Sequence, residues 1–193
     1  GAQHSQGLYS FFMHVPGLKV VAPTTPYDAK GCLIHAIRDN DPVVYVEHRI
    51  LHFQKGPVPQ PLYTVAPGKA RVAAPGSDVT LVGISHMQVE CLRAQRYLEM
   101  IGISAEVIDP IWLQPLDTET IIHVAKDAGA VVTVEEHQIA GGMGSAVAEV
   151  LAQNHPVPQE FVGVRDQFGQ SGKPEELIEH YLLGRNELAA VVL

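Results

Sequence analysis

The stretch DVTLVGISHMQVECLRAQRYLEMIGISAEVID, residues 78–109, decides the fold that we expect for this chain. It begins with an apolar strand at 78–84 and ends with a second strand at 104–109. Between them the pattern predicts a helix from Gln88 to Ile101, which Gly102 ends because glycine readily adopts the left-handed conformation found after helices. A strand, a helix and a strand in this order form a parallel crossover unit, so the stretch predicts an α/β domain.

The same alternation continues to the end of the sequence. Further apolar strands are expected at 130–135 and 160–164. Alternating strands and helices predict a mostly parallel sheet covered by helices on both faces, and we expect residues 77–193 to form a complete domain of this class. The remaining helices are expected to begin at Asp117, Ser145, Pro174 and Asn186.

The region before this domain holds only one crossover unit. Residues 18–23 and 42–46 are apolar strands, joined by a helix that begins at Thr25 and runs to about Arg38. One such unit cannot bury both faces of a sheet. We therefore expect residues 1–53 to be the end of a domain whose beginning is absent.

A proline-rich segment separates the two regions. Three prolines lie within residues 54–61, which indicates an extended chain. We expect residues 54–76 to be a linker that contains a short edge strand near residues 69–72.

Composition limits the classes of partner. The chain has 193 residues, 46% of them apolar and 18% charged, which is typical of a globular protein. A net charge of −8 argues against a nucleic-acid backbone or an anionic membrane surface as the main partner. No apolar run approaches the roughly 20 residues of a membrane span, and residues 1–6 do not form a signal peptide. Cys32 and Cys91 lie in helical patterns and are expected to be buried thiols, which fits the reducing cytoplasm.

Two motifs near the third strand of the main domain have open interpretations. The glycine-rich run GGMGS at 141–145 follows a strand and opens a helix, so it is either a phosphate site or, as we favour, a tight turn that lets helix and sheet pack closely. Glu135, Glu136 and His137 end the strand, where ligands gather in parallel sheets. They could perform acid–base chemistry, cap a helix or form an interface hydrogen bond.

The amino-terminal region offers three further candidates. His4 stands in a polar Gln-His-Ser cluster, where it is either catalytic or structural. His48 and His52 are four residues apart but lack a third ligand for zinc. The helix end at 36–41 places Asp39 and Asp41 beside unpaired carbonyls, which suits a hard cation, although a solvated turn is the simpler interpretation.

Several segments together resemble one family, the beta subunits of the thiamine-diphosphate-dependent 2-oxo acid dehydrogenases of the pyruvate and branched-chain types. The resemblance extends over essentially the whole chain and is carried by ordered, specific runs. These are GAQHSQ at 1–6, HVPGLKVVAP at 14–23, DAKG at 28–31, AIRDNDPVV at 36–44, PGKARV at 67–72 and QPLD at 114–117.

The resemblance implies a fold and a set of site residues. Residues 1–53 would be the latter part of a pyrimidine-binding domain, and residues 77–193 a transketolase C-terminal domain. His4 would line the active-site channel on the thiazolium side and assist acyl transfer to a lipoyl group. A potassium site, built mainly from backbone carbonyls, would lie at Ala36, Ile37, Asp39 and Asp41.

The resemblance also implies partners. The glutamate that activates thiamine diphosphate lies upstream of the GAQHSQ run in this family and is not in this chain. The alpha subunit would hold the diphosphate and its magnesium. A second beta subunit would pair through residues 77–193, and the acyltransferase core with its lipoyl domain would accept the acyl group.

Two alternatives to this family stay open. The runs VEEHQIAGGMGSAV at 134–147 and FGQSGKPEEL at 168–177 look more like transketolase and deoxyxylulose-phosphate synthase. A sugar-phosphate enzyme needs basic residues at its channel, but residues 1–35 hold only Lys19 and Lys30, which favours a small 2-oxo acid. The other alternative is a non-catalytic module for dimerisation and assembly.

Overall fold

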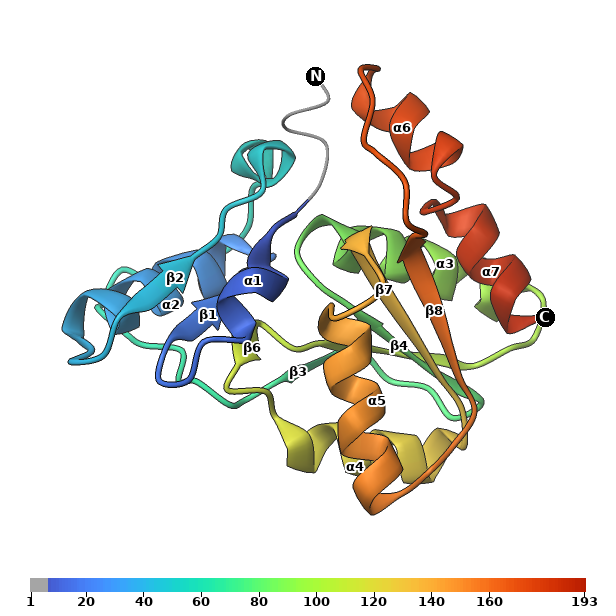
Figure 1. Cartoon of the computed structure of the whole chain (residues 1–193), viewed down its shortest axis with the longest axis horizontal. Coiled ribbons are helices and arrows are strands. Elements are labelled where there is room, and N and C mark those ends of the chain that lie inside the picture. The colour runs from blue at the N-terminus through green and yellow to red at the C-terminus, as the bar shows by residue number, and fades with distance from the viewer. Residues whose placement is uncertain (1–6) are drawn as a thin grey trace.

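The computed structural model describes residues 7–193 and contains two sheets. In the larger sheet four neighbouring strands are parallel and one edge strand is antiparallel to them, as the crossover pattern predicts. Figure 1 shows this sheet at the centre of the main domain. Its order is β3 (Arg71–Ala74), β5 (Ala105–Asp109), β4 (Val79–Gly83), β7 (Val131–Gln138) and β8 (Gln159–Val164).

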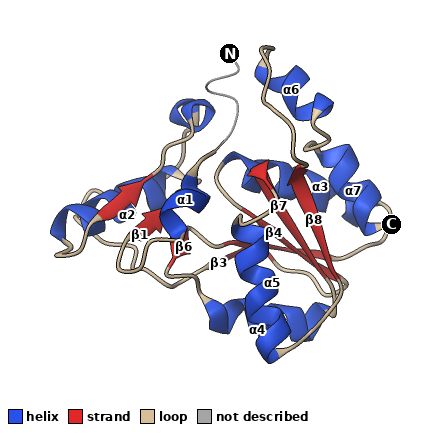
Figure 2. Ribbon diagram, viewed as in Figure 1, coloured by secondary structure: helices blue, strands red, loops and turns tan. Residues whose placement is uncertain are grey.

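Helices cover both faces of this sheet, which confirms the predicted class (Figures 1 and 2). On one face, α3 (His86–Met100) and α7 (Arg185–Val192) pack on the strands in a core that includes Leu81, Leu98 and Leu188. On the other face, α4 (Thr118–Ala128) and α5 (Met143–Asn154) bury Ile84, Ile121 and Val147. The short helix α6 (Pro174–His180) adds Leu177 and Ile178 to the first core.

The smaller sheet has the order β2 (Val43–Tyr45), β1 (Lys19–Val21) and β6 (Trp112–Gln114). Strands β1 and β2 are parallel and joined by α2 (Pro26–Arg38), so the predicted crossover unit is confirmed. Strand β6 was not expected, because its three residues lie between two prolines and have no alternation of their own. It pairs antiparallel with β1 and thereby ties the main domain to the amino-terminal region.

Two other short elements were not predicted from the sequence. Helix α1 (Tyr9–Met13) has five residues, and the 3-10 helix η2 (Arg49–Phe53) also has five. Both are shorter than the periodicity needed to recognise a helix from sequence. They matter because Tyr9 of α1 packs on His137, and His48 at the start of η2 lies against Glu136, both near the carboxyl end of β7.

The proline-rich segment packs against the outer side of α2. The Lys30 ammonium donates to the backbone carbonyls of Pro59, Gln60 and Pro61. Gly31 is required there, since a Cβ atom at this position would lie 2.6 Å from Val65. The edge strand lies at 71–74 rather than 69–72. The division at 1–53, 54–76 and 77–193 stays a prediction.

Caps set the ends of the helices where the sequence indicated them. The Thr25 hydroxyl accepts a hydrogen bond from the Asp28 backbone N–H at the start of α2. The Asp117 carboxylate accepts one from Thr120 at the start of α4, and Gly129 ends that helix with φ of +71°. Among residues 7–193 no helix is long and apolar enough to cross a membrane.

Candidate functional site

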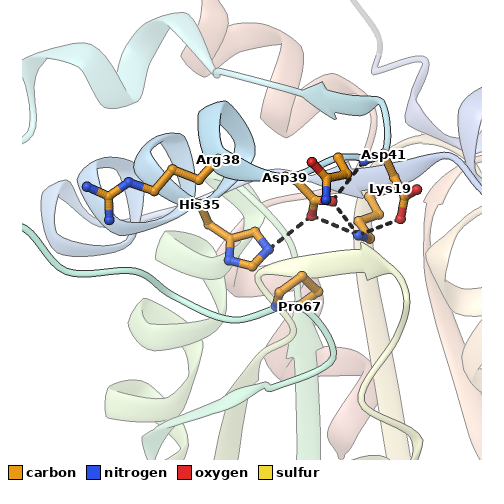
Figure 3. A pocket seen from close by; sticks show the side chains of 7 residues that line it. Lys19, His35, Arg38, Asp39, Asp41 and Pro67 are labelled. Atoms are coloured by element: carbon orange, nitrogen blue, oxygen red, sulfur yellow. Dashed lines mark hydrogen bonds and ion pairs between the residues drawn. The ribbon is translucent and has the colours of Figure 1, made fainter.

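The two carboxylates that were predicted to bind a cation lie in the turn after α2, on either side of a lysine from β1. Lys19 Nζ donates to both carboxylate oxygens of Asp39, at 2.8 and 2.7 Å, and to Asp41 at 3.0 Å. His35 Nε2 lies 3.1 Å from Asp39, and the group lines an open cleft of about 660 Å³ (Figure 3). The Lys19 ammonium, followed by the Asp41 backbone N–H, lowers the pKa of Asp39 to about 2. Asp39 is therefore ionised at neutral pH.

This arrangement limits how a cation could bind at the turn. The carboxylates of Asp39 and Asp41 already have a cationic partner, so side-chain oxygens alone are poor candidates for a metal site. The backbone carbonyls of Ala36 and Ile37 lie in the last turn of α2, where carbonyls lack a partner within the helix. Oxygen donors of this kind suit a hard cation such as potassium. Residues 7–193 contain no cluster of three histidine, cysteine or acidic side chains that could hold a metal.

Glu135 occupies the helix terminus that could have bound phosphate. Its carboxylate accepts hydrogen bonds from the backbone N–H groups of Met143, at 2.6 Å, and Gly144, at 3.2 Å. The side chain is 1% exposed. A Cβ atom on Gly142 would lie 2.3 Å from this carboxylate, so glycine is required for the close approach. The tight-turn interpretation of the glycine run is therefore correct for this structure.

His137 is buried beside this cap and lines a second cleft. Its Nε2 atom lies 3.1 Å from Glu135, yet neither ring nitrogen makes a well-aligned hydrogen bond within the described part of the chain. The Tyr9 ring packs edge-on against it, with ring centroids 4.6 Å apart. Burial, and then the charge of Glu136, raises the pKa of Tyr9, so its hydroxyl stays protonated. The cleft holds about 560 Å³ and is also lined by Phe11 and Phe168.

The predicted catalytic residue His4 lies outside the described residues. The first described residue lies close to the carboxyl end of β7, because the Gly7 N–H donates to the Glu136 carbonyl at 3.4 Å. The structure thus brings the beginning of α1 next to β7. Among the predicted candidates, it does not bring the Asp39 turn and the Glu135–His137 motif into one site.

Sequence reasoning missed an ion network with two buried carboxylates, which joins the larger sheet to α2. Arg71 donates to Asp109 at 2.7 Å and lies 3.1 Å from Asp28, and both carboxylates are at most 3% exposed. Burial raises the pKa of Asp109 to about 6, although the charge of Arg71 opposes the shift. The three residues lie on β3, β5 and α2, so no local pattern could have connected them. Both carboxylates of the network are paired with Arg71, whose Nε atom has no partner within the described residues.

Comparison with known proteins identifies the family. The chain matches the family model described as "Transketolase, pyrimidine binding domain" over residues 1–54, and "Transketolase, C-terminal domain" over residues 68–188. It is 42% identical over 152 residues to the beta subunit of acetoin:2,6-dichlorophenolindophenol oxidoreductase from Cupriavidus necator. It is 42% identical over 151 residues to the beta subunit of the pyruvate dehydrogenase E1 component from Staphylococcus aureus.

These matches cover part of each relative. They span 79% and 78% of this chain but only 45% and 46% of the two relatives, so the chain spans about half the length of the curated relatives it matches. Among solved structures, a "Split gene transketolase, inactive beta4 tetramer" matches 100% of this chain and 62% of its own, with 35% identity and a TM-score of 0.87. The chain belongs to the transketolase family, and the beta subunits of a pyruvate dehydrogenase E1 component and of an acetoin:2,6-dichlorophenolindophenol oxidoreductase are among its relatives.

Proposed function

We propose that the chain is part of the beta subunit of a thiamine-diphosphate-dependent 2-oxo acid dehydrogenase. The identity of 42% over 151 residues to the beta subunit of a pyruvate dehydrogenase E1 component carries the proposal. The complete enzyme would decarboxylate a 2-oxo acid oxidatively and pass the acyl group to a lipoyl domain. Bound thiamine diphosphate would supply the nucleophilic carbon chemistry, and the protein would orient and polarise the reactants.

The structure around α5 supports the proposal that another subunit holds the diphosphate of the cofactor. Helix α5 has the N-terminus most suited to a diphosphate, but Glu135 fills it, so this chain offers no such site there. We assign the diphosphate and its magnesium to an alpha subunit. His4 would act at the reacting end of the cofactor as an acid or base, since imidazole titrates near neutral pH. The isolated chain should therefore be inactive toward 2-oxo acids.

We further propose that potassium binds at the end of α2, through backbone carbonyls at Ala36 and Ile37 and beside Asp39 and Asp41. The ammonium of Lys19 occupies oxygens of both carboxylates, which leaves the backbone carbonyls as donors for a weakly hydrated cation. The test is the melting temperature in potassium, sodium and choline chloride at equal ionic strength. A higher melting temperature in potassium alone supports the site, and equal values in the three salts contradict it.

The beta subunits would pair through residues 77–193. We also place the protein in the cytoplasm, because Cys32 and Cys91 are free and buried.

The second candidate function is that of a split transketolase. The solved structure of that name, aligned over 100% of this chain at a TM-score of 0.87, favours it. An assay distinguishes the two candidate functions. The chain is reassembled with its upstream region and an alpha subunit, and both ketol transfer between sugar phosphates and oxidation of a 2-oxo acid are measured.

A further inference from the structure

An open cleft of about 560 Å³ lies where α1 meets the carboxyl ends of β7 and β8. Leu8 and Phe11 line it from the start of α1, and Phe168 lines it from the segment after β8. Phe11 is 71% exposed and Phe168 is 96% exposed. Two aromatic side chains from distant parts of the sequence are thus presented to solvent around one cleft.

The segment that carries Phe168 is anchored by neighbouring side chains. Gln138, at the end of β7, accepts a hydrogen bond from the Asp166 N–H at 2.7 Å and donates to the Gln167 carbonyl at 3.2 Å. The Tyr181 hydroxyl donates to the Phe168 carbonyl at 2.8 Å. These contacts hold Asp166 in the left-handed region, with φ of +46°. Because the backbone is already ordered, a ligand that packs on Phe168 does not have to order this segment.

His137 gives the cleft a buried polar group without a partner. Its ring lines the cleft and is 1% exposed, and neither nitrogen has a hydrogen-bond partner within the described residues. Nε2 lies 3.1 Å from the Glu135 carboxylate, which favours the proton on that nitrogen and leaves Nδ1 as an acceptor. A buried polar atom without a partner costs free energy, so a ligand that donates to Nδ1 would gain by pairing it.

The charges around the cleft favour a cation. Among the described residues that line it, Asp166 has the one carboxylate, and none is a lysine or an arginine. The Glu135 carboxylate lies behind His137, and the whole chain has a net charge of −8. The faces of exposed phenylalanine rings also attract cations. A phosphate or carboxylate ligand would meet only repulsion here.

We propose that this cleft binds a small organic cation that has a planar apolar group and an N–H donor, the chemistry of an aralkylammonium ion. The apolar group would pack on Phe11 and Phe168, the charge would face Asp166, and an N–H would donate to His137 Nδ1. Since neighbouring atoms cover both nitrogens of His137, its ring has to turn toward the cleft to accept this bond. The cleft volume is within the usual range for small-molecule sites.

Nuclear magnetic resonance titration of the full chain with 2-phenylethylammonium tests the site. A probe this small is expected to bind with a Kd on the order of 1–10 mM. It should shift the backbone amides of residues 137–141 and 166–168 and the ring nitrogens of His137. The matched neutral and anionic probes are 2-phenylethanol and 3-phenylpropionate, and the anion should bind about fivefold more weakly than the cation.

Two variants separate the contributions. Asp166→Asn should reduce the preference for the cation to below about twofold, and asparagine tolerates the left-handed backbone at this position. Phe168→Ala should weaken binding of the cation about three- to tenfold. Phe53→Ala is the matched control, because Phe53 is 84% exposed and lies outside the cleft. It should leave the affinity unchanged.

Four results would overturn the proposal. The first two are the absence of saturable shifts in these residues and equal affinity for the cation and the anion. Neither of them depends on a variant. The third is a Phe168→Ala variant that binds the cation as tightly as the wild type does. The fourth is a set of shifts in residues 137–141 and 166–168 that grows with protein concentration without any probe, because a second copy of the chain would then occupy the cleft.

Discussion

Removing the Glu135 carboxylate should destabilise the main domain strongly. Glu135→Ala leaves the backbone N–H groups of Met143 and Gly144 buried without an acceptor, and it removes two charge-assisted hydrogen bonds. Each unsatisfied buried donor costs about 1–3 kcal/mol, so we expect the free energy of unfolding to fall by about 3–5 kcal/mol. Glu135→Gln keeps one acceptor oxygen and should lose about half as much.

Urea unfolding followed by circular dichroism measures this loss. Glu149→Ala is the matched control, because it removes an exposed carboxylate from the same helix and should change the free energy of unfolding by less than about 0.5 kcal/mol. A loss below about 1 kcal/mol for Glu135→Ala would refute the reasoning. It would mean that water or another group satisfies the start of α5, and the phosphate interpretation of the glycine run would have to be reopened.

Three further predictions concern charged groups. Arg71→Met leaves Asp28 and Asp109 buried without a cation and should lower the free energy of unfolding, measured in urea at pH 7, by about 3–5 kcal/mol. The pKa of Asp109 is raised to about 6, so its contribution to stability should be most favourable below about pH 4 and decline as the pH rises through 6. Asp109→Asn should lack this trend. Because the pKa of Asp39 is lowered to about 2, its contribution to stability should be complete above about pH 4 and be lost as the pH falls through 2. If Asp39→Asn and the wild type unfold in acid at the same pH, this prediction is wrong. In the complete enzyme, His4→Ala should slow acyl transfer by about 10²–10⁴ with thiamine diphosphate affinity within about twofold, and transfer within twofold of the wild type would return His4 to a structural role.

The regular part of the fold follows from the sequence because its signals are local. Strands such as Val79–Gly83 are apolar runs bounded by turn residues, and helices such as Thr118–Ala128 have an N-cap and a C-terminal glycine. Strand β6 could not be predicted, since it is defined by its pairing with β1 in another part of the chain. Short elements stabilised by distant partners leave no period in the sequence.

The candidate sites divide in the same way. The Asp39 turn was recognisable from the helix end and from the family resemblance, but the Lys19 ammonium between its carboxylates was not, because β1 lies twenty residues away. Glu135 was recognised as a possible helix cap, and the structure identifies α5 as the helix that it caps. The stacking of His48 on His86 depends on the packing of two sheets, which no spacing rule predicts.

The most direct test of the proposed function is substrate oxidation by the reassembled enzyme. The chain with its upstream region is combined with an alpha subunit, thiamine diphosphate and magnesium, and reduction of 2,6-dichlorophenolindophenol is followed with pyruvate, a branched-chain 2-oxo acid or acetoin. Ketol transfer between sugar phosphates is measured in parallel. We predict dye reduction with a 2-oxo acid and no ketol transfer. Ketol transfer without 2-oxo acid oxidation, or dye reduction with acetoin alone, would contradict the proposal.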